Sequence, residues 1–207
     1  GCVYPMFGVE SGNQKVLDEI VKKDLDLNKL VESARLCHKE GIDTAAFYIF
    51  GFPGETRENI RETIDLAFDM FKKYKTRPHA NIARPLMGTE LYRTAKAMNV
   101  LIDTSIMDPE DRYEGPKTLI GPQMIETQEF SLEYLTSTFR RYQRGFIVQS
   151  LINLGWFASQ HPLIFLRAIG SMLLDVVREP TKAKETILRY TLRKFIFPHS
   201  MARKDLY

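Results

Sequence analysis

The stretch FYIFGFPGET, residues 47–56, joins an apolar run to a helical pattern. The run Ile42–Phe50 is apolar almost throughout, which is typical of a strand in a parallel sheet covered on both faces. The glycines of the junction let the backbone approach a ligand closely, and Pro53 stiffens the turn. Thr56 can cap the following helix, whose free N–H groups would favour an anionic ligand. The inner face of that helix is predicted at Ile60, Ile64, Ala67, Phe68 and Phe71.

The same order of strand, glycine-containing loop and helix occurs twice more. Val3–Val9 is a short apolar run that leads into GVESG, and a helix with Val16, Leu17, Ile20 and Val21 on one face follows. His79–Ala83 predicts a third strand, after which RPLMGT leads into a helix over Glu90–Met98. Alternating strands and helices predict parallel βαβ units, in which the strand ends form the ligand-binding edge.

One further helix lies between the first two strands. Asn28 is its expected N-cap and Gly41 stands at its C-terminal end. Its apolar positions follow helical spacing at Leu30, Val31, Ala34, Cys37 and His38. Cys37 and His38 are adjacent on this helix and point in different directions, so we interpret them as structural and expect no metal ligands here.

Charge divides the chain into two parts. The first 139 residues contain 17 Lys and Arg against 22 Asp and Glu, whereas residues 140–207 contain 12 against 4. The composition changes near residue 125, so we predict an α/β domain over 1–125 and a basic, all-α extension over 126–207. The two cysteines among 207 residues fit a reducing compartment, which predicts a cytoplasmic protein. The sequence has neither a P-loop nor a G-x-G-x-x-G fingerprint, and no H-E-x-x-H motif.

The quoted stretch and two others together resemble the radical S-adenosylmethionine (SAM) superfamily. The three stretches are GVESGNQKVLDEIVKK at 8–23, GIDTAAFYIFGFPGETRENIRETIDLA at 41–67 and MGTELY at 87–92. They are most similar to members that carry an upstream cobalamin-binding domain and to the tRNA-methylthiolating branch. The family fold is a partial (β/α)6 barrel, and the resemblance implies that this chain is its second half, with strands four to six.

The resemblance also implies roles for individual residues. A polar residue after the fourth strand contacts the SAM ribose in the family; Glu10 matches it, with Ser11 beside it, and carboxylate oxygens suit a ribose diol. The alternative for Glu10 is a cap on the following helix. The loops after the fifth and sixth strands border the adenine, which assigns the remaining SAM contacts to Ile49, Gly51, Phe52, Pro53, Ala83 and Arg84.

The family's chemistry requires a C-x-x-x-C-x-x-C run that holds a [4Fe–4S] cluster. This chain has only Cys2 and Cys37. We therefore expect it to be a fragment whose missing N-terminal half carries the cluster, and we expect the isolated chain to be inactive. The parent enzyme would cleave SAM reductively to a 5′-deoxyadenosyl radical, and a cobalamin domain upstream is compatible with the resemblance.

Two other functions stay open on the sequence. One is a noncatalytic half-barrel with a helical module that binds a protein or membrane partner, and the other is an unrelated α/β domain with tight turns. We expect one helix over 130–150, then apolar stretches that are split at His161-Pro162, and a further helix near 182–197. The basic segment 140–207 is expected to form a helical bundle that packs on the barrel. Peripheral contact with an anionic membrane is the main alternative. Nucleic-acid binding is not expected, because the aromatic residues of the segment lie within apolar runs.

Overall fold

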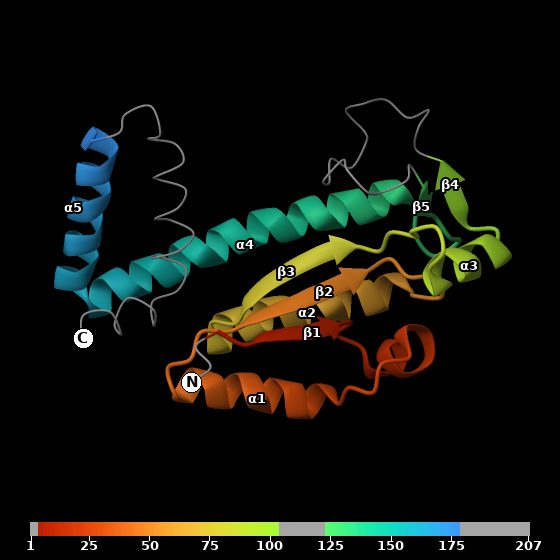
Figure 1. Ribbon diagram of the computed structural model, residues 1–207, viewed down its shortest axis with the longest axis horizontal. Coiled ribbons are helices and arrows are strands. Elements are labelled where there is room, and N and C mark those ends of the chain that lie inside the picture. The colour runs from red at the N-terminus through yellow and green to blue at the C-terminus, as the bar shows by residue number, and fades with distance from the viewer. Residues whose placement is uncertain (1–3, 104–122, 179–207) are drawn as a thin grey trace.

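A computed structural model of the chain describes residues 4–103 and 123–178, so the helix expected near 182–197 lies outside the described residues. Three strands form a parallel sheet with the order β1-β2-β3, and helices connect them (Figure 1). This arrangement confirms the predicted fold class of three parallel βα units followed by helices. The elements are β1 (Met6–Glu10), η1 (Val16–Val21, a short π-helix), α1 (Leu27–Lys39), β2 (Ala45–Phe50), α2 (Arg57–Tyr74) and β3 (Arg77–Ile82).

Polar side chains start the two connecting helices. Thr56 accepts a hydrogen bond from the N–H of Asn59, and the Asn59 side chain accepts one from the N–H of Thr56, so α2 has the predicted cap in reciprocal form. The prediction that Asn28 caps α1 was wrong. Asp26 is the cap, because its carboxylate accepts hydrogen bonds from the N–H groups of Asn28 and Lys29. A carboxylate two residues earlier satisfies free donors at the helix start that the Asn28 side chain does not reach.

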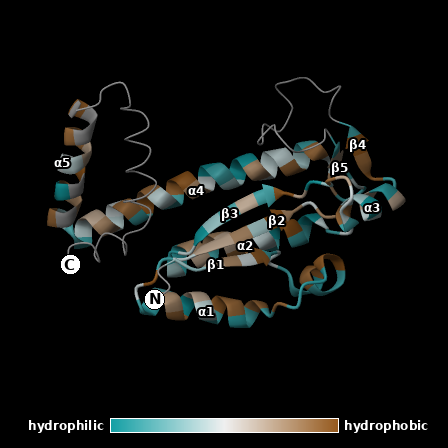
Figure 2. Ribbon diagram, in the orientation of Figure 1, coloured by the Kyte–Doolittle hydropathy of each residue, from teal (hydrophilic) through white to brown (hydrophobic). Residues whose placement is uncertain are grey.

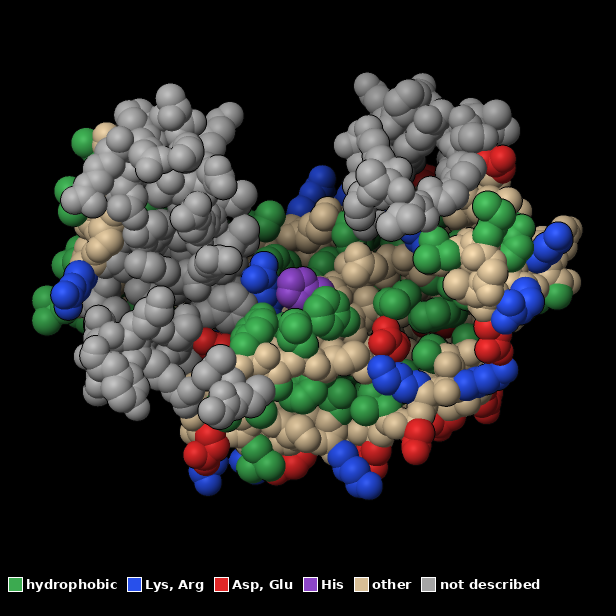
Figure 3. All heavy atoms as spheres, in the orientation of Figure 1, with side chains coloured by type: hydrophobic (Ala, Val, Ile, Leu, Met, Phe, Trp, Pro, Cys, Tyr) green, Lys and Arg blue, Asp and Glu red, His purple; other side chains and the backbone are tan. Residues whose placement is uncertain are grey.

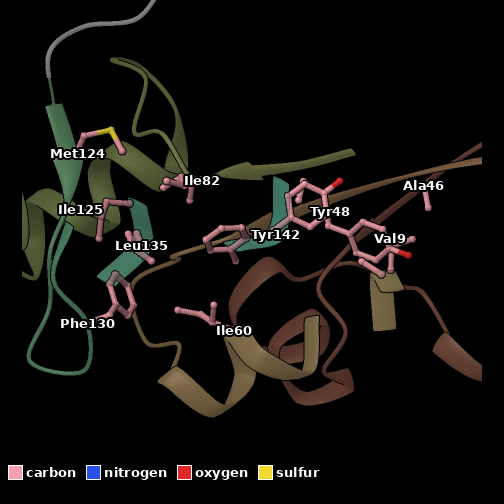
Figure 4. Packing of buried hydrophobic residues seen from close by; sticks show 14 of the residues in the cluster. Val9, Ala46, Tyr48, Ile60, Ile82, Met124, Ile125, Phe130, Leu135 and Tyr142 are labelled. Carbon is pink, nitrogen blue, oxygen red and sulfur yellow. The ribbon is translucent and has the colours of Figure 1, made fainter. Parts of the chain in front are cut away.

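The helices α1 and α2 pack against one face of the sheet, and α2 lies behind the strands in Figure 1. Side chains alternate along each strand, so Ala46, Tyr48 and Phe50 of β2 are buried between the sheet and the helices. The loop after β1 also approaches α2 closely. A Cβ atom on Gly12 would lie 2.6 Å from the carbonyl oxygen of Glu62, so only glycine fits there. Figure 4 shows the packing of Val9, Ala46, Tyr48, Ile60 and Tyr142.

The C-terminal helix α4 (Leu132–Gln160) runs along the sheet beside β3. The hydroxyl of Tyr142 donates a hydrogen bond of 2.9 Å to the carbonyl oxygen of Pro78. Sequence reasoning separated a helix near 130–150 from the apolar residues after it; the structure joins both in one helix of 29 residues. The break at His161-Pro162 is confirmed, since α5 (Pro162–Arg178) begins there. The domain boundary near residue 125 stays a prediction, although α4 contributes Leu132, Leu135 and Tyr142 to the core of the sheet domain.

A small unit lies beside the carboxyl ends of the strands; its helix was predicted over Glu90–Met98, and its two strands were not predicted. It consists of α3 (Glu90–Ala97) and the antiparallel pair β4 (Leu101–Asp103) and β5 (Gln123–Ile125) (Figure 1). Three-residue strands are too short to show an alternating pattern. Met124 and Ile125 of β5 are buried with Phe130 and Leu135, and thereby connect this unit to the start of α4 (Figure 4).

Candidate functional site at the carboxyl edge of the sheet

The face of the sheet opposite α1 and α2 has no described helix packed on it, and it faces the viewer in Figure 1. Phe47 is 37% exposed on this face, and its ring stacks on that of His79 with 5.0 Å between the centroids. Ile49 and Asn81 follow at the next outward positions of the paired strands. Figure 3 shows this face between the two grey regions, with hydrophobic side chains beside a histidine and charged groups of both signs. We refer to it as the open face.

An ion pair lies over the end of β1 on the open face. Nζ of Lys23 is 3.1 Å from Oε1 of Glu10 and donates a hydrogen bond of 2.5 Å to the carbonyl oxygen of Gly8. A Cβ atom on Gly8 would lie 2.8 Å from Nζ of Lys23, so glycine at this position makes room for the pair. Both side chains are partly exposed, so a carboxylate and an ammonium group are presented together at this edge.

Glu10 itself has a left-handed backbone, with φ of 63°. The backbone changes direction there, at a bulge in the pairing of β1 with β2. The alternative role for Glu10 as a helix cap is not what the structure shows. Asn13 accepts the hydrogen bond from the N–H of Val16 at the start of η1, and the Glu10 carboxylate pairs with Lys23 instead.

Ser11, the neighbour of Glu10, is fully buried. Its hydroxyl lies 3.2 Å from the hydroxyl of Thr63 in α2, and the N–H of Gly12 also donates to that Thr63 oxygen. The Ser11 side chain therefore holds the loop onto α2 and points away from the open face. Its predicted contact with SAM stays a prediction, and only its backbone is placed to make one.

The turn after β2 closes around a buried carboxylate. Oε2 of Glu55 accepts hydrogen bonds from the N–H groups of Gly51, at 2.6 Å, and Phe52, at 2.8 Å. These two donors are therefore occupied by Glu55. The expectation that N–H groups at the start of α2 attract an anionic ligand concerns other donors and stays a prediction. Gly51 has φ of 92°, and a Cβ atom there would also lie 3.0 Å from Leu135 of α4.

Burial changes the acidity of two groups at the site. Desolvation raises the pKa of Glu55 to about 7, although the hydrogen bonds from Phe52 and Gly51 act in the opposite direction. The other oxygen of this carboxyl, Oε1, is buried and has no hydrogen-bond partner in the described part of the chain. Burial and the nearby charge of Arg77 lower the pKa of His79, which favours a neutral imidazole against the Phe47 ring.

The residues predicted to contact SAM lie at one edge of the sheet, but some of them are partly exposed there and others are buried. Ile49 is partly exposed on the open face, and Phe52 is partly exposed in the turn after β2. Gly51, Pro53 and the side chain of Ala83 are buried, so any contact from them would be made by the backbone or through a small opening. Arg84 is partly exposed directly after Ala83, whose N–H extends the β2–β3 pairing by a hydrogen bond to Phe50.

Sequence reasoning missed Lys23 and the stacked rings. Lys22 and Lys23 are adjacent and equivalent in the sequence, yet Lys22 pairs with Glu90 at 2.9 Å and only Lys23 reaches Glu10. The alternation along β3 could have placed His79 on the outward face, but its partner Phe47 lies on another strand. The residues that the structure describes contain no group of three or more His, Cys, Asp or Glu arranged to hold a metal ion.

Comparisons with known proteins find one family model that matches part of the chain, and several relatives. Residues 1–67 match the family model of the Radical SAM superfamily. An uncharacterized methyltransferase of Pyrococcus horikoshii is 28% identical over 84% of this chain and 35% of its own length. The cytidylyl-2-hydroxyethylphosphonate methyltransferase of Streptomyces wedmorensis is 29% identical over 54% of this chain and 20% of its own length. The chain therefore spans about a third or less of the length of these curated relatives.

Proposed function

We propose that this chain belongs to the radical SAM superfamily and that its open face forms the ribose and adenine side of a SAM site in a longer methyltransferase. The observation that carries the proposal is the Glu10–Lys23 pair at the end of β1, within the segment that matches the family model. The loops after β2 and β3 end at the same edge of the parallel sheet, where α/β folds bind their ligands.

The residues at this edge suit SAM chemically. SAM has a ribose diol, an adenine ring and an amino acid end with both charges. Glu10 offers carboxylate oxygens to a diol or an ammonium group, Lys23 offers an ammonium group to a carboxylate, and Ile49 offers an apolar surface to adenine. When bound and reductively cleaved, SAM supplies the 5′-deoxyadenosyl radical. This chain would bind and orient the cofactor and exclude water from it.

The residues of this chain do not fit the [4Fe–4S] cluster that the family uses. The sequence contains two cysteines and no C-x-x-x-C-x-x-C run, and Cys37 lies in α1 on the other face of the sheet. We assign no step of the reaction to a cluster held by this chain. The proposal therefore places the cluster, and any cobalamin, on parts of the longer protein beyond this sequence.

Methyl transfer is proposed from the names of two of the relatives, and the substrate is left open. A noncatalytic half-barrel that binds a partner is the second candidate, favoured by the lack of cluster ligands in this sequence. The two candidates differ in one measurable respect, since only a SAM site requires the Glu10–Lys23 pair to contribute to SAM affinity.

Two adjacent lysines provide a matched test in the full-length protein with its cluster reconstituted under anaerobic conditions. Lys23→Ala is expected to weaken SAM binding by about 1–3 kcal/mol, because the carboxylate of bound SAM would lose the Lys23 ammonium group as its partner. Lys22→Ala removes the same charge one residue earlier but breaks only an exposed pair with Glu90, so SAM affinity should stay within about twofold. Isothermal titration calorimetry measures both affinities, and a parallel melting curve reports stability.

Glu10→Gln completes the test, because it keeps the size of the side chain and removes its charge. We expect weaker SAM binding with little change in melting temperature. Equal SAM affinity for Lys23→Ala, Lys22→Ala and the unchanged protein would contradict the proposal. If Lys23→Ala and Glu10→Gln lower only the melting temperature, the pair has a structural role and the partner-binding candidate is preferred.

A further inference from the structure

The second half of α4 exposes an apolar stripe. Five large apolar side chains recur at helical spacing and each is more than half exposed: Ile147, Val148, Leu151, Ile152 and Trp156. The opposite side of the same helix is used for packing, since Phe157 and Asn153 are buried there. Most of the stripe is therefore a separate surface, although the Trp156 ring contacts the sheet domain, where its centroid lies 5.8 Å from Nζ of Lys75 at the end of α2.

The helix α5 also carries exposed apolar side chains. It starts directly after α4 and packs against the end of it (Figure 1). Leu163 is 81% exposed at the corner between the two helices. Figure 2 shows hydrophobic residues along α5 and the C-terminal part of α4. The other apolar side chains of α5 that are more than half exposed are Leu166, Leu173, Leu174 and Val177.

The charged residues of this part of the chain are mostly basic. Arg140 and Arg144 precede Val148, Ile152 and Trp156 at intervals of four residues, so they extend the same stripe toward the sheet domain. Between residues 140 and 178 the sequence has five arginines and one acidic residue, and residues 179–207 add seven Lys and Arg against three Asp and Glu. Arg140, Arg141, Arg144 and Arg167 are all exposed.

We propose that the exposed apolar surface of α4 and α5 docks on an anionic lipid bilayer, with Trp156 and Leu163 inserted at the interface and the arginines on lipid headgroups. Helices that lie in a membrane interface typically have an apolar face that includes tryptophan, with basic residues beside it. An anionic surface also complements the excess of basic residues. No described helix is both long and apolar enough to cross a bilayer, so contact from one side is the geometry that fits.

The chain has a built-in probe for this contact, because Trp156 is its only tryptophan. Vesicles of phosphatidylcholine with phosphatidylglycerol should shift the emission of Trp156 to shorter wavelength and protect it from acrylamide. Vesicles of phosphatidylcholine alone should bind at least about tenfold less protein, and added salt should release it, because salt screens the arginines. Co-sedimentation with the vesicles measures the binding directly.

A pair of double variants separates the local surface from the net charge. L151E/I152E is expected to reduce binding to the anionic vesicles at least about tenfold. L36E/M98E adds the same two charges at exposed apolar positions on α1 and just after α3. This control should bind the anionic vesicles no more than about twofold more weakly than the unchanged protein. Circular dichroism checks that both variants fold.

Several results would overturn the proposal. One is equal binding to neutral and anionic vesicles, and another is an equal loss of binding in the two double variants. A third is vesicle binding that leaves the emission of Trp156 unchanged. If the protein ignores vesicles and light scattering shows self-association that only L151E/I152E abolishes, a second copy covers the surface instead.

Discussion

Glu55 is the residue on which the turn after β2 depends. Its carboxylate accepts hydrogen bonds from two consecutive N–H groups, which stabilise the charged form. The side chain is also buried, and the loss of water destabilises the charged form. Burial is the larger effect, and it raises the pKa of Glu55 to about 7. The protonated form is therefore favoured in the folded chain at pH values where the unfolded chain is already ionised.

This difference predicts a pH dependence of stability. Below pH 4.5 the carboxyl is protonated in both states, and the contribution of Glu55 to the free energy of unfolding is fully present. As the pH rises from 4.5 to about 7, the unfolded chain ionises first, so that contribution is lost. We expect a loss of about 3 kcal/mol from this one group.

Glu55→Gln isolates the effect, because glutamine keeps the acceptor oxygen and does not ionise. Urea unfolding of both proteins between pH 4.5 and 8 gives the difference in their free energies of unfolding. That difference should change in favour of Glu55→Gln as the pH rises. A constant difference over the whole range would mean that the carboxyl is ionised in the folded chain, with its two hydrogen bonds outweighing burial.

At the scale of elements, glycine decides how α4 meets the sheet domain. A Cβ atom on Gly145 would lie 2.6 Å from Cζ of Phe68, so the helix approaches α2 more closely than alanine permits. Gly155 lies in the same helix, and a Cβ atom there would have no neighbour within 4 Å among the described residues. The intrinsic helix propensity of glycine is the same at both positions, so the two positions differ only in the residues around them.

The comparison of Gly145→Ala with Gly155→Ala tests this packing. Alanine at either position favours the helix by up to about 1 kcal/mol. Gly155→Ala should therefore be as stable as the unchanged protein or more stable. Gly145→Ala should be less stable than Gly155→Ala by about 1–3 kcal/mol, because the Phe68 ring must move. Thermal unfolding of the two variants measures the difference, and equal melting temperatures would show that the ring moves at no cost.

At the scale of the whole molecule, the sheet is covered on one face and open on the other. The helices α1 and α2 bury one face, α4 runs beside β3, and the open face carries the Glu10–Lys23 pair. In a partial barrel the equivalent face looks inward, so the open face is where the rest of the proposed enzyme would complete the site. Under the proposed function, this chain would contribute to SAM binding and other parts of the protein would hold the cluster.

If other parts of the protein hold the cluster, the isolated chain should not form one. After anaerobic reconstitution with iron and sulfide, the 207-residue chain should not retain a stoichiometric [4Fe–4S] cluster, because its two cysteines are fewer than the ligands required. It should also fail to cleave SAM in the presence of a reductant. Iron and sulfide analysis after desalting gives the result. A full complement of both, with the broad visible absorbance of such a cluster, would disprove the assignment of the cluster to other parts of the protein.

The sequence by itself determined the three parallel βα units and their order. The apolar run before Gly51, the Thr56 cap and the helical spacing after it are local patterns, and local patterns fix strands, turns and helices. The family resemblance added the prediction that the carboxyl edge of the sheet binds the cofactor. The break before α5 was also readable, since proline cannot continue a helix whose N–H it lacks.

Only the tertiary structure decided which side chains meet. The sequence cannot tell Lys22 from Lys23, because the choice depends on how η1 returns across the end of β1. It could not show that Ser11 faces Thr63, since these residues are 52 positions apart. It also could not tell which apolar residues of α4 are buried and which are exposed, because that depends on the position of β3 and α2. Contacts between distant segments follow from packing in three dimensions, and no local period encodes them.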